Sequence, residues 1–219
     1  MPDLITLNNP RAAASEAYRA LRTNLMFYSV DNPIITLVIT SPVPGGSKST
    51  ALANLAVTLA QADHRTIIVD ADLRQPAQHT LWGLSNEQGL TTMLLESAGD
   101  APLQNTPVEN LRVLTSGPLP PNPADMVGSR RMNDVIAALK AEADYVLFDA
   151  PPVLAVTDAA LLGLKVDSLL LVLQAGKSRR DHAARARQEL ERVKVPVIGT
   201  VLLNAPRDAA VGKYGAAQS

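Results

Sequence analysis

Six apolar runs divide the chain, and within each run the apolar residues follow one another without regular alternation. The runs cover residues 34–40, 65–70, 111–117, 144–152, 167–176 and 195–204. Such continuity is typical of strands buried on both faces, because each face then has to be nonpolar. Helical patterns occupy the intervals at 49–62, 123–141, 157–163 and 178–193. Strands that alternate with helices predict βαβ units, so we expect an α/β fold with a mostly parallel sheet covered on both sides.

A separate helical pattern precedes the first run. Residues 13–28 read AASEAYRALRTNLMFY and predict an amphipathic helix. The last residues, APRDAAVGKYGAAQS, are small and polar and predict a frayed end. We therefore expect an N-terminal helix region at 1–30, a main domain at 31–205 and a flexible tail at 206–219.

Composition narrows the class of protein. The net charge is −1, so no global charge draws the chain to nucleic acid, and no nucleic-acid partner is expected. The chain has no cysteine, which excludes disulfides and thiolate metal sites and is compatible with a reducing cytosol. No apolar stretch approaches the roughly 20 residues of a membrane span, and the N-terminus lacks a signal pattern. A cytoplasmic location without a membrane span of its own is expected.

The first apolar run leads into the sequence SPVPGGSKST at residues 41–50, which is followed by a helical pattern. A glycine-rich turn between a strand and a helix gathers backbone N–H groups around an anion, and the helix dipole adds to the attraction. In such a loop Lys48 would reach the β- and γ-phosphates, Ser49 would place its hydroxyl on Mg²⁺, and Thr50 would lie near the α-phosphate. The alternative is an ordinary strand-to-helix turn that happens to contain a lysine.

Carboxylates follow two other apolar runs. Asp70 and Asp72 stand at the end of the second run, with a spacing that points both side chains the same way, and Asp149 ends the fourth. Carboxylates at strand ends can bind a hard cation, and one of them can act as the base that accepts a hydroxyl proton. Asp149 stands where phosphate-loop ATPases hold Mg²⁺ through water. A solvated acidic loop is the alternative for each alone, but the three elements in this order favour a nucleotide site.

At this point the chain resembles a known family, the bacterial tyrosine kinases (BY-kinases) of capsule and exopolysaccharide synthesis, which are P-loop relatives of the ParA/MinD ATPases. The matching segments are SEAYRALRTNL, TSPVPGGSKST, NLAVTLAQ, IIVDADLRQP, GLTTMLLE, LTSGPLPPNPADM, DYVLFDAPPVLAVTDA and GTVLLN, in family order over residues 15–204. The loop resembles the Walker A motif, DADLR the Walker A′ motif and LFDAPP the Walker B motif. ParA/MinD proteins carry an extra lysine early in the loop, where this chain has Pro42-Val43-Pro44, which favours the kinase branch.

The resemblance implies roles for individual residues, with ATP and Mg²⁺ as cofactors. It assigns nucleotide binding to Gly45, Gly46, Ser47, Lys48, Ser49, Thr50 and Asn204, the last beside adenine. It assigns the metal to Ser49, Asp72 and Asp149. Asp70 becomes a candidate to accept the tyrosine hydroxyl proton, although the division of roles between Asp70 and Asp72 stays open. Arg74 is expected at the same edge, and a strand-end turn is the alternative for Asn204.

The resemblance also implies assembly. In the family a Glu-x-x-Arg-x-x-Arg pattern docks neighbouring subunits in a ring, and here the pattern is Glu16, Arg19 and Arg22. Residues three apart share a helix face, so the three charges are expected in one patch, with a solvated face and local ion pairs as the alternative. The implied partner is a membrane-anchored activator, a polysaccharide co-polymerase that recruits the kinase to the inner face of the membrane.

Two positions depart from the family pattern. Ser47 stands where the loop rule has glycine, and a Cβ there costs strain of about 1–3 kcal/mol if the backbone needs a glycine conformation. The family's tail tyrosine cluster is reduced to Tyr214, since the other three tyrosines, Tyr18, Tyr28 and Tyr145, lie in the first helix and at the start of a strand.

Three functions follow from these patterns. The first is an ATP-dependent protein-tyrosine autokinase that regulates polysaccharide assembly, with Tyr214 as the phosphoacceptor. The second is a ParA/MinD-like ATPase switch without kinase activity. The third, motivated by Ser47, is a nucleotide-impaired structural member of the family.

Overall fold

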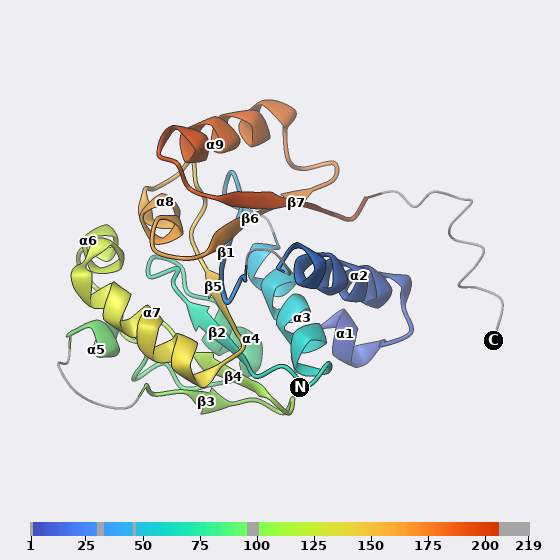
Figure 1. Ribbon diagram of the computed structural model, residues 1–219, viewed down its shortest axis with the longest axis horizontal. Helices are drawn as coiled ribbons and strands as arrows, with labels where there is room; N and C mark the ends of the chain where they lie inside the picture. Colours follow the sequence, from blue (N-terminus) through green and yellow to red (C-terminus); the bar gives the residue numbers. More distant parts are fainter. Residues whose placement is uncertain (1, 30–32, 46, 96–100, 206–219) are drawn as a thin grey trace.

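The computed structural model describes residues 2–29, 33–45, 47–95 and 101–205. Its centre is a seven-stranded sheet of order β3-β4-β2-β5-β1-β6-β7 (Figure 1). The strands are β1 (Thr36–Thr40), β2 (Thr66–Asp70), β3 (Gln104–Asn105), β4 (Leu111–Leu114), β5 (Tyr145–Asp149), β6 (Ser168–Gln174) and β7 (Val197–Leu203). All neighbours pair in parallel except β3 and β4, which are antiparallel. The predicted class is therefore confirmed.

Helices cover both faces of the sheet (Figure 1). One face carries α1 (Ile5–Asn8), α2 (Ala13–Tyr28), α3 (Lys48–Ala60) and α4 (Gln78–Trp82), whose apolar side chains pack with Leu37, Ile39 and Leu147 of the strands. The other face carries α5 (Leu90–Leu95), α6 (Pro123–Gly128), α7 (Arg130–Glu142), α8 (Asp158–Gly163) and α9 (Arg180–Arg192), with a core built around Val38, Val69 and Phe148. Every residue of β1 and β2 is buried, as the continuous apolar runs predict.

The amphipathic helix predicted at 13–28 is α2, with the same bounds. Leu25 of α2 is buried in the core that α3 shares, so the N-terminal helix packs on the main domain. Whether residues 1–30 also act as an oligomerisation region stays a prediction, and the tail at 206–219 lies outside the described residues.

Two parts of the sequence pattern differ from the structure. The helix predicted at 123–141 is two helices, because Ser129 adopts an extended conformation (φ −61°, ψ 160°) and its side chain accepts the N–H of Met132 as the N-cap of α7. The last run, 195–204, forms β7 at an edge of the sheet, where Thr200 and Leu202 are exposed. The short elements α1, α4, α5 and β3 had no clear pattern because they hold six residues or fewer.

Candidate nucleotide site

The glycine-rich loop connects the carboxyl end of β1 to the start of α3. Gly45 has φ +91°, a conformation that L side chains rarely adopt, so a glycine is needed at that position. Ser47 has φ −87° and ψ 40° and is exposed, so its backbone stays in the half of conformational space open to L-residues. The serine that departs from the loop rule therefore sits without left-handed strain. Gly46 lies outside the described residues.

Lys48, the first residue of α3, lies between two carboxylates. Its Nζ is 2.7 Å from Oδ1 of Asp149 and 3.0 Å from Oδ2 of Asp72, and all three side chains are at least nine-tenths buried. Burial opposes the charge on Lys48, but Asp149 and Asp72 outweigh it and raise the pKa of the ammonium. The charged lysine thus joins the ends of three elements that are far apart in sequence, namely the loop, the end of β2 and the end of β5.

The same atoms fit a magnesium ion. Two buried carboxylates, at the ends of the paired strands β2 and β5, converge on one cation, and carboxylate oxygens are the ligands that Mg²⁺ prefers. Ser49 brings a hydroxyl to the same place, since its Oγ lies 3.4 Å from Lys48 Nζ. Within the described part of the chain, no group of three or more His, Cys, Asp or Glu side chains could hold a metal ion alone. Bound phosphate and water would therefore have to complete the coordination, as is usual for Mg²⁺.

Asp70 occupies a different environment from Asp72. It is fully buried, its Oδ2 accepts the N–H groups of Ala77 (2.9 Å) and Gln78 (2.8 Å), and its Oδ1 has no partner. Burial, and then the negative charge of Asp149, raise the pKa of Asp70 to about 7. Asp72 instead pairs with Lys48 and accepts the N–H of Gln75 (3.0 Å), so the two carboxylates at the carboxyl end of β2 contact different groups. Asp70 supports the segment that leads into α4.

Gln78, at the start of α4, was not anticipated from the sequence. Its Nε2 donates to Oδ2 of Asp149 (2.8 Å) and to the carbonyl of Ser49 (3.3 Å), while its Oε1 accepts from Trp82 Nε1 (3.2 Å). The residue is fully buried. Gln78 therefore fixes the orientation of the Asp149 carboxylate. No local signal marks it, because one glutamine in a five-residue helix belongs to no recognisable spacing.

A cavity of about 310 Å³ opens above these residues, within the usual size range of small-molecule sites. Its lining comprises Ser41, Pro44, Gly45, Lys48, Ser49, Asp72, Arg74, Gln75, Pro151, Pro152, Ala155 and Val156. Arg74 reaches it as predicted, held by two hydrogen bonds of 3.1 and 3.2 Å to the buried carboxylate of Asp158. Thr50 lies in the first turn of α3 but does not line the cavity.

Asn204 follows β7 at the same edge of the sheet. Its backbone is left-handed (φ 54°) and the residue is exposed. Leu203 pairs with Gln174 of β6, and Gln174 lines a small hollow beside the loop together with Ser47 and Lys177. Asn204 is thus near the loop side of the sheet, although it lines neither cavity.

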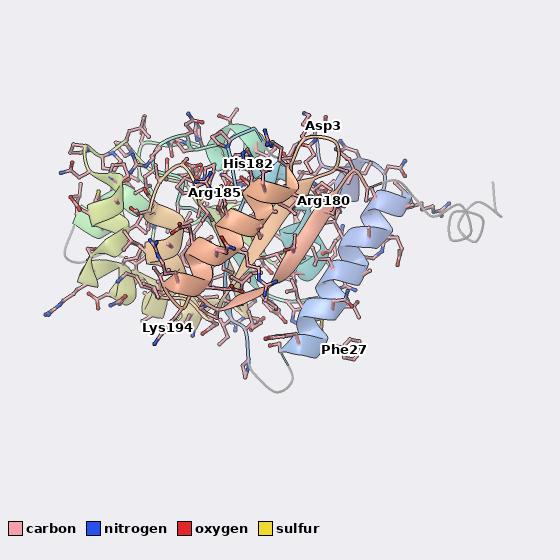
Figure 2. The ribbon with its side chains drawn as sticks, turned by 90° about the horizontal axis from the view of Figure 1, so that it is seen from above. Asp3, Phe27, Arg180, His182, Arg185 and Lys194 are labelled. Carbon is pink, nitrogen blue, oxygen red and sulfur yellow. The ribbon has the colours of Figure 1, made fainter. Side chains whose placement is uncertain are left out.

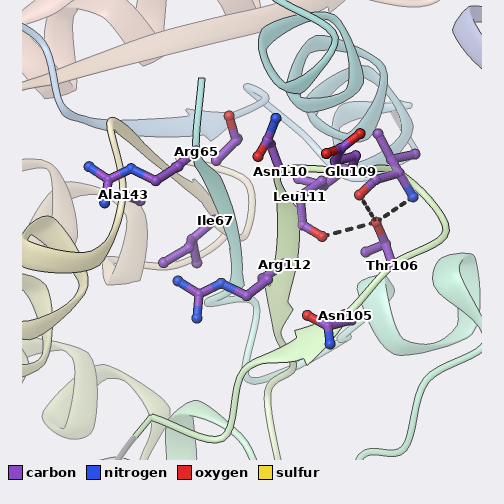
Figure 3. Close-up of a pocket in the computed structure, with 11 residues that line it drawn as sticks. Arg65, Ile67, Asn105, Thr106, Glu109, Asn110, Leu111, Arg112 and Ala143 are labelled. Carbon is purple, nitrogen blue, oxygen red and sulfur yellow. Dashed lines mark hydrogen bonds between the residues drawn. The ribbon is translucent and has the colours of Figure 1, made fainter. Parts of the chain in front are cut away.

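A second cavity, of about 390 Å³, lies at the opposite edge of the sheet, near the amino ends of β2 and β4 (Figure 3). Arg65 and Arg112 line it, and each is paired with an acidic residue, Asp144 at 2.8 Å and Glu142 at 3.0 Å. Ligands of open α/β sheets bind at the carboxyl ends of the strands. This cavity is therefore not the candidate nucleotide site.

The three charges predicted for assembly, Glu16, Arg19 and Arg22, contact different groups. Arg19 pairs with Glu16 on the surface of α2, at 2.7 Å. Arg22 instead donates to the carbonyl of Thr58 (2.8 Å), one of the last-turn carbonyls of α3 that the helix leaves without a partner. Arg22 therefore helps to secure α2 to α3, and like Arg19 it remains partly exposed. The role of the three charges in assembly stays a prediction. Tyr214 lies outside the described residues.

Comparisons with known proteins agree with this geometry. A family model described as an AAA domain matches residues 36–192. Tyrosine-protein kinase YwqD of Bacillus subtilis is 41% identical over 214 residues, which cover 97% of this chain and 90% of YwqD. The putative tyrosine-protein kinase CapB of Staphylococcus aureus is 36% identical, over 94% of this chain and 91% of CapB.

Solved structures give the same picture. The kinase domain of the Escherichia coli tyrosine kinase ETK superposes with a TM-score of 0.89 at 33% identity, over 94% of this chain and 82% of that domain. The cell division ATPase MinD of Pyrococcus furiosus superposes with a TM-score of 0.64 at 25% identity, over 77% of this chain and 71% of MinD. Among the described residues, no helix has both the length and the apolar character needed to cross a membrane.

Proposed function

Because this chain belongs to the bacterial tyrosine-protein kinases, P-loop proteins related to the ParA/MinD ATPases, we propose that it transfers the γ-phosphoryl group of ATP to tyrosine in a Mg²⁺-dependent reaction. The observation that carries the proposal is that the Lys48 ammonium lies between Asp72 and Asp149. Lys48 directly follows a loop that needs glycine at position 45.

The loop and the first turn of α3 bind the phosphates in this proposal. The first N–H groups of a helix have no intrahelical partner, so the amino end of α3 would donate to a phosphate, and the helix dipole would favour its negative charge. Lys48 exchanges one carboxylate partner for a phosphate oxygen when ATP arrives. Asn204, which follows the edge strand β7, would contact the adenine.

Asp72, Asp149 and the Ser49 hydroxyl hold the magnesium ion. When bound, Mg²⁺ neutralises negative charge on the phosphates and orients them for in-line transfer. Gln78 donates to Oδ2 of Asp149 at 2.8 Å, which leaves Oδ1, now paired with Lys48, as the oxygen that would hold the metal. Buried ligands of this kind need such support because an unpaired carboxylate oxygen is costly to bury.

Asp72 is better placed than Asp70 to accept the tyrosine proton. Asp72 lines the cavity, whereas Asp70 is enclosed behind it and engaged by two backbone N–H groups. A base has to come within hydrogen-bond reach of the hydroxyl it deprotonates. We assign acceptance of the proton to Asp72 and a supporting role to Asp70, with Tyr214 as the phosphoacceptor.

The polysaccharide system, the partner and the location complete the proposal. The kinase acts in capsule or exopolysaccharide assembly and self-associates through Glu16, Arg19 and Arg22. A membrane-anchored activator recruits it to the inner face of the membrane. The nucleotide-impaired alternative loses its motive, because Ser47 has a negative φ. The ATPase-switch alternative is not favoured, because the relatives that cover most of the chain are tyrosine-protein kinases.

Calorimetry of Mg²⁺·ATP binding tests the proposal with three chains, the native protein, Ser47→Gly and Lys48→Met. We expect the first two to bind with similar micromolar Kd and Lys48→Met to lose binding. Binding that appears only in Ser47→Gly would restore the nucleotide-impaired alternative. Incubation with ATP and activator should then yield phosphotyrosine that Tyr214→Phe removes. ATP hydrolysis without phosphotyrosine would favour the ATPase switch.

A further inference from the structure

The helix α9 and its flanking residues carry a charge excess that the nucleotide site does not use. Residues 177–194 contain seven Lys or Arg and three Asp or Glu, a net charge of +4. The rest of the chain contains 13 basic and 18 acidic residues, a net charge of −5. The protein as a whole is nearly neutral, but its positive charge is concentrated in segment 177–194 and the rest of the chain is acidic.

Ion pairing within the segment leaves this excess free. Three arginines neutralise the three acids, in the pairs Arg179–Asp181 (2.9 Å), Arg187–Glu191 (2.6 Å) and Arg192–Glu189 (3.1 Å). Across the described chain, the side chains of the four remaining cations have no ion pair or hydrogen bond, and all four residues are exposed. These four, Lys177, Arg180, Arg185 and Lys194, are named here the α9 patch.

The α9 patch lies on the outer surface of the molecule. Only Ala186 and Leu190 of α9 are buried against the sheet, so the rest of the helix surface stays outside. Figure 2 looks onto this surface and shows Arg180, His182, Arg185 and Lys194 along the helix and its carboxyl end. The 13 helical residues span roughly 20 Å, so the cations are spread over a surface instead of gathered in a pocket.

We propose that the α9 patch is a docking surface for an anionic phospholipid bilayer. Clusters of four to eight basic residues on a helix are attracted to anionic lipid, and each Lys or Arg near the surface contributes about 1 kcal/mol. Segment 177–194 has no Phe, Trp or Tyr, and its largest exposed apolar side chain is Val193, so the helix adsorbs by charge and does not insert. Only the choice of a bilayer as the partner depends on the membrane recruitment that is part of the proposed function.

Other anionic partners fit the surface less well. Single-stranded nucleic acid binds through platforms of several aromatic side chains, and this segment has no Phe, Trp or Tyr and a single His, His182. An acidic peptide is bound by a compact cluster of arginines, whereas the cations of the α9 patch are spread along a helix of 13 residues and its ends. Because the rest of the chain has a net charge of −5, an anionic bilayer would attract the α9 patch and repel the remainder, which favours adsorption through α9.

Vesicle co-sedimentation tests the proposal with the full chain at 50 mM salt. We expect binding to vesicles of phosphatidylglycerol, none to vesicles of phosphatidylcholine, and loss of binding at 0.5 M salt, where the Debye length is much shorter. The variant Arg180→Gln/Arg185→Gln should bind about thirtyfold more weakly, from two contributions of about 1 kcal/mol. The matched control Arg65→Gln/Arg112→Gln removes the same charge at the other end of the sheet and should keep most of the binding.

Several results would overturn the proposal. These are equal binding to both lipids, equal weakening by both double variants, or tighter binding to duplex DNA or polyglutamate than to phosphatidylglycerol. Urea midpoints of both variants confirm folding, and a charge-reversed Arg185→Glu chain repeats the test if the double variant unfolds. Mg²⁺·ATP affinity, measured on the same samples, separates this proposal from the kinase proposal, because each measurement can fail while the other succeeds.

Discussion

Replacing Asp70 with asparagine should stabilise the protein increasingly as the pH rises from 5 to 8, relative to the native chain. Asp70 is fully buried, and its pKa is raised from 3.8 to about 7 by burial and by the charge of Asp149. A carboxyl whose folded pKa is raised favours the protonated form, so the folded state loses stability as the pH rises from the unfolded pKa to the folded pKa. Asparagine has nearly the same shape and never ionises.

The size of the effect follows from the two pKa values. A shift of about three pKa units corresponds to about 4 kcal/mol, which is absent below pH 4 and complete above pH 7. About 3 kcal/mol of this penalty develops between pH 5 and pH 7. For a chain of 219 residues each kcal/mol moves the Tm by roughly 2–4 °C, so the Tm difference should grow by about 6–12 °C. The NH₂ group of asparagine takes the place of the unpartnered Oδ1. It lowers the unfolding free energy by an amount that does not depend on pH, so the change of the difference with pH is not affected.

Urea unfolding of both chains at half-unit intervals between pH 5 and 8, with EDTA and without nucleotide, measures the difference in unfolding free energy. Asp144→Asn is the matched control. Because Arg65 donates to Asp144 at 2.8 Å, the pKa of that carboxyl is lowered, and its stabilisation is already complete above the unfolded pKa. Asp144→Asn should therefore be less stable by a constant amount over the same range. If the difference in unfolding free energy between Asp70→Asn and the native chain also stayed constant from pH 5 to 8, the reasoning would be refuted.

Three further substitutions test other contacts of the site and the fold. Lys48→Met leaves two buried carboxylates without their cation, so the unfolding free energy measured in urea should fall by about 3–5 kcal/mol, and an unchanged urea midpoint would contradict the buried ion pairs. Gln78→Leu removes the donor to Asp149, so calorimetry should show weaker Mg²⁺·ATP binding. Thermal unfolding should show a loss of stability of about 1–3 kcal/mol. Unchanged affinity would mean that Asp149 does not need the hydrogen bond from Gln78. Gly89→Ala places a Cβ 2.1 Å from the Thr115 carbonyl oxygen and should cost about 3 kcal/mol or more, while Gly199→Ala, with open space around it, should change stability by less than about 1 kcal/mol. Equal melting temperatures for the two alanine variants would refute the close approach at Gly89.

The fold class and the rough location of the site could be read from the sequence. Apolar periodicity is a local property, so six strands and α2 appear where the patterns predict them. Parallel strands end at a common edge, which is why Lys48, Asp72 and Asp149 could be expected together although up to about a hundred residues separate them.

The contacts within the site were decided only by the tertiary structure. Asp70 and Asp72 are two residues apart, yet one is enclosed behind α4 and the other lines the cavity, because the strand ends between them. Gln78 meets Asp149 across 71 residues, and Arg22 meets the Thr58 carbonyl across 36. Such partners depend on how helices pack on the sheet, and neither spacing nor charge pattern along the chain encodes that packing. The sequence by itself therefore determined which residues gather at the carboxyl edge, and the packing of α2, α3 and α4 decided which atoms each of them contacts.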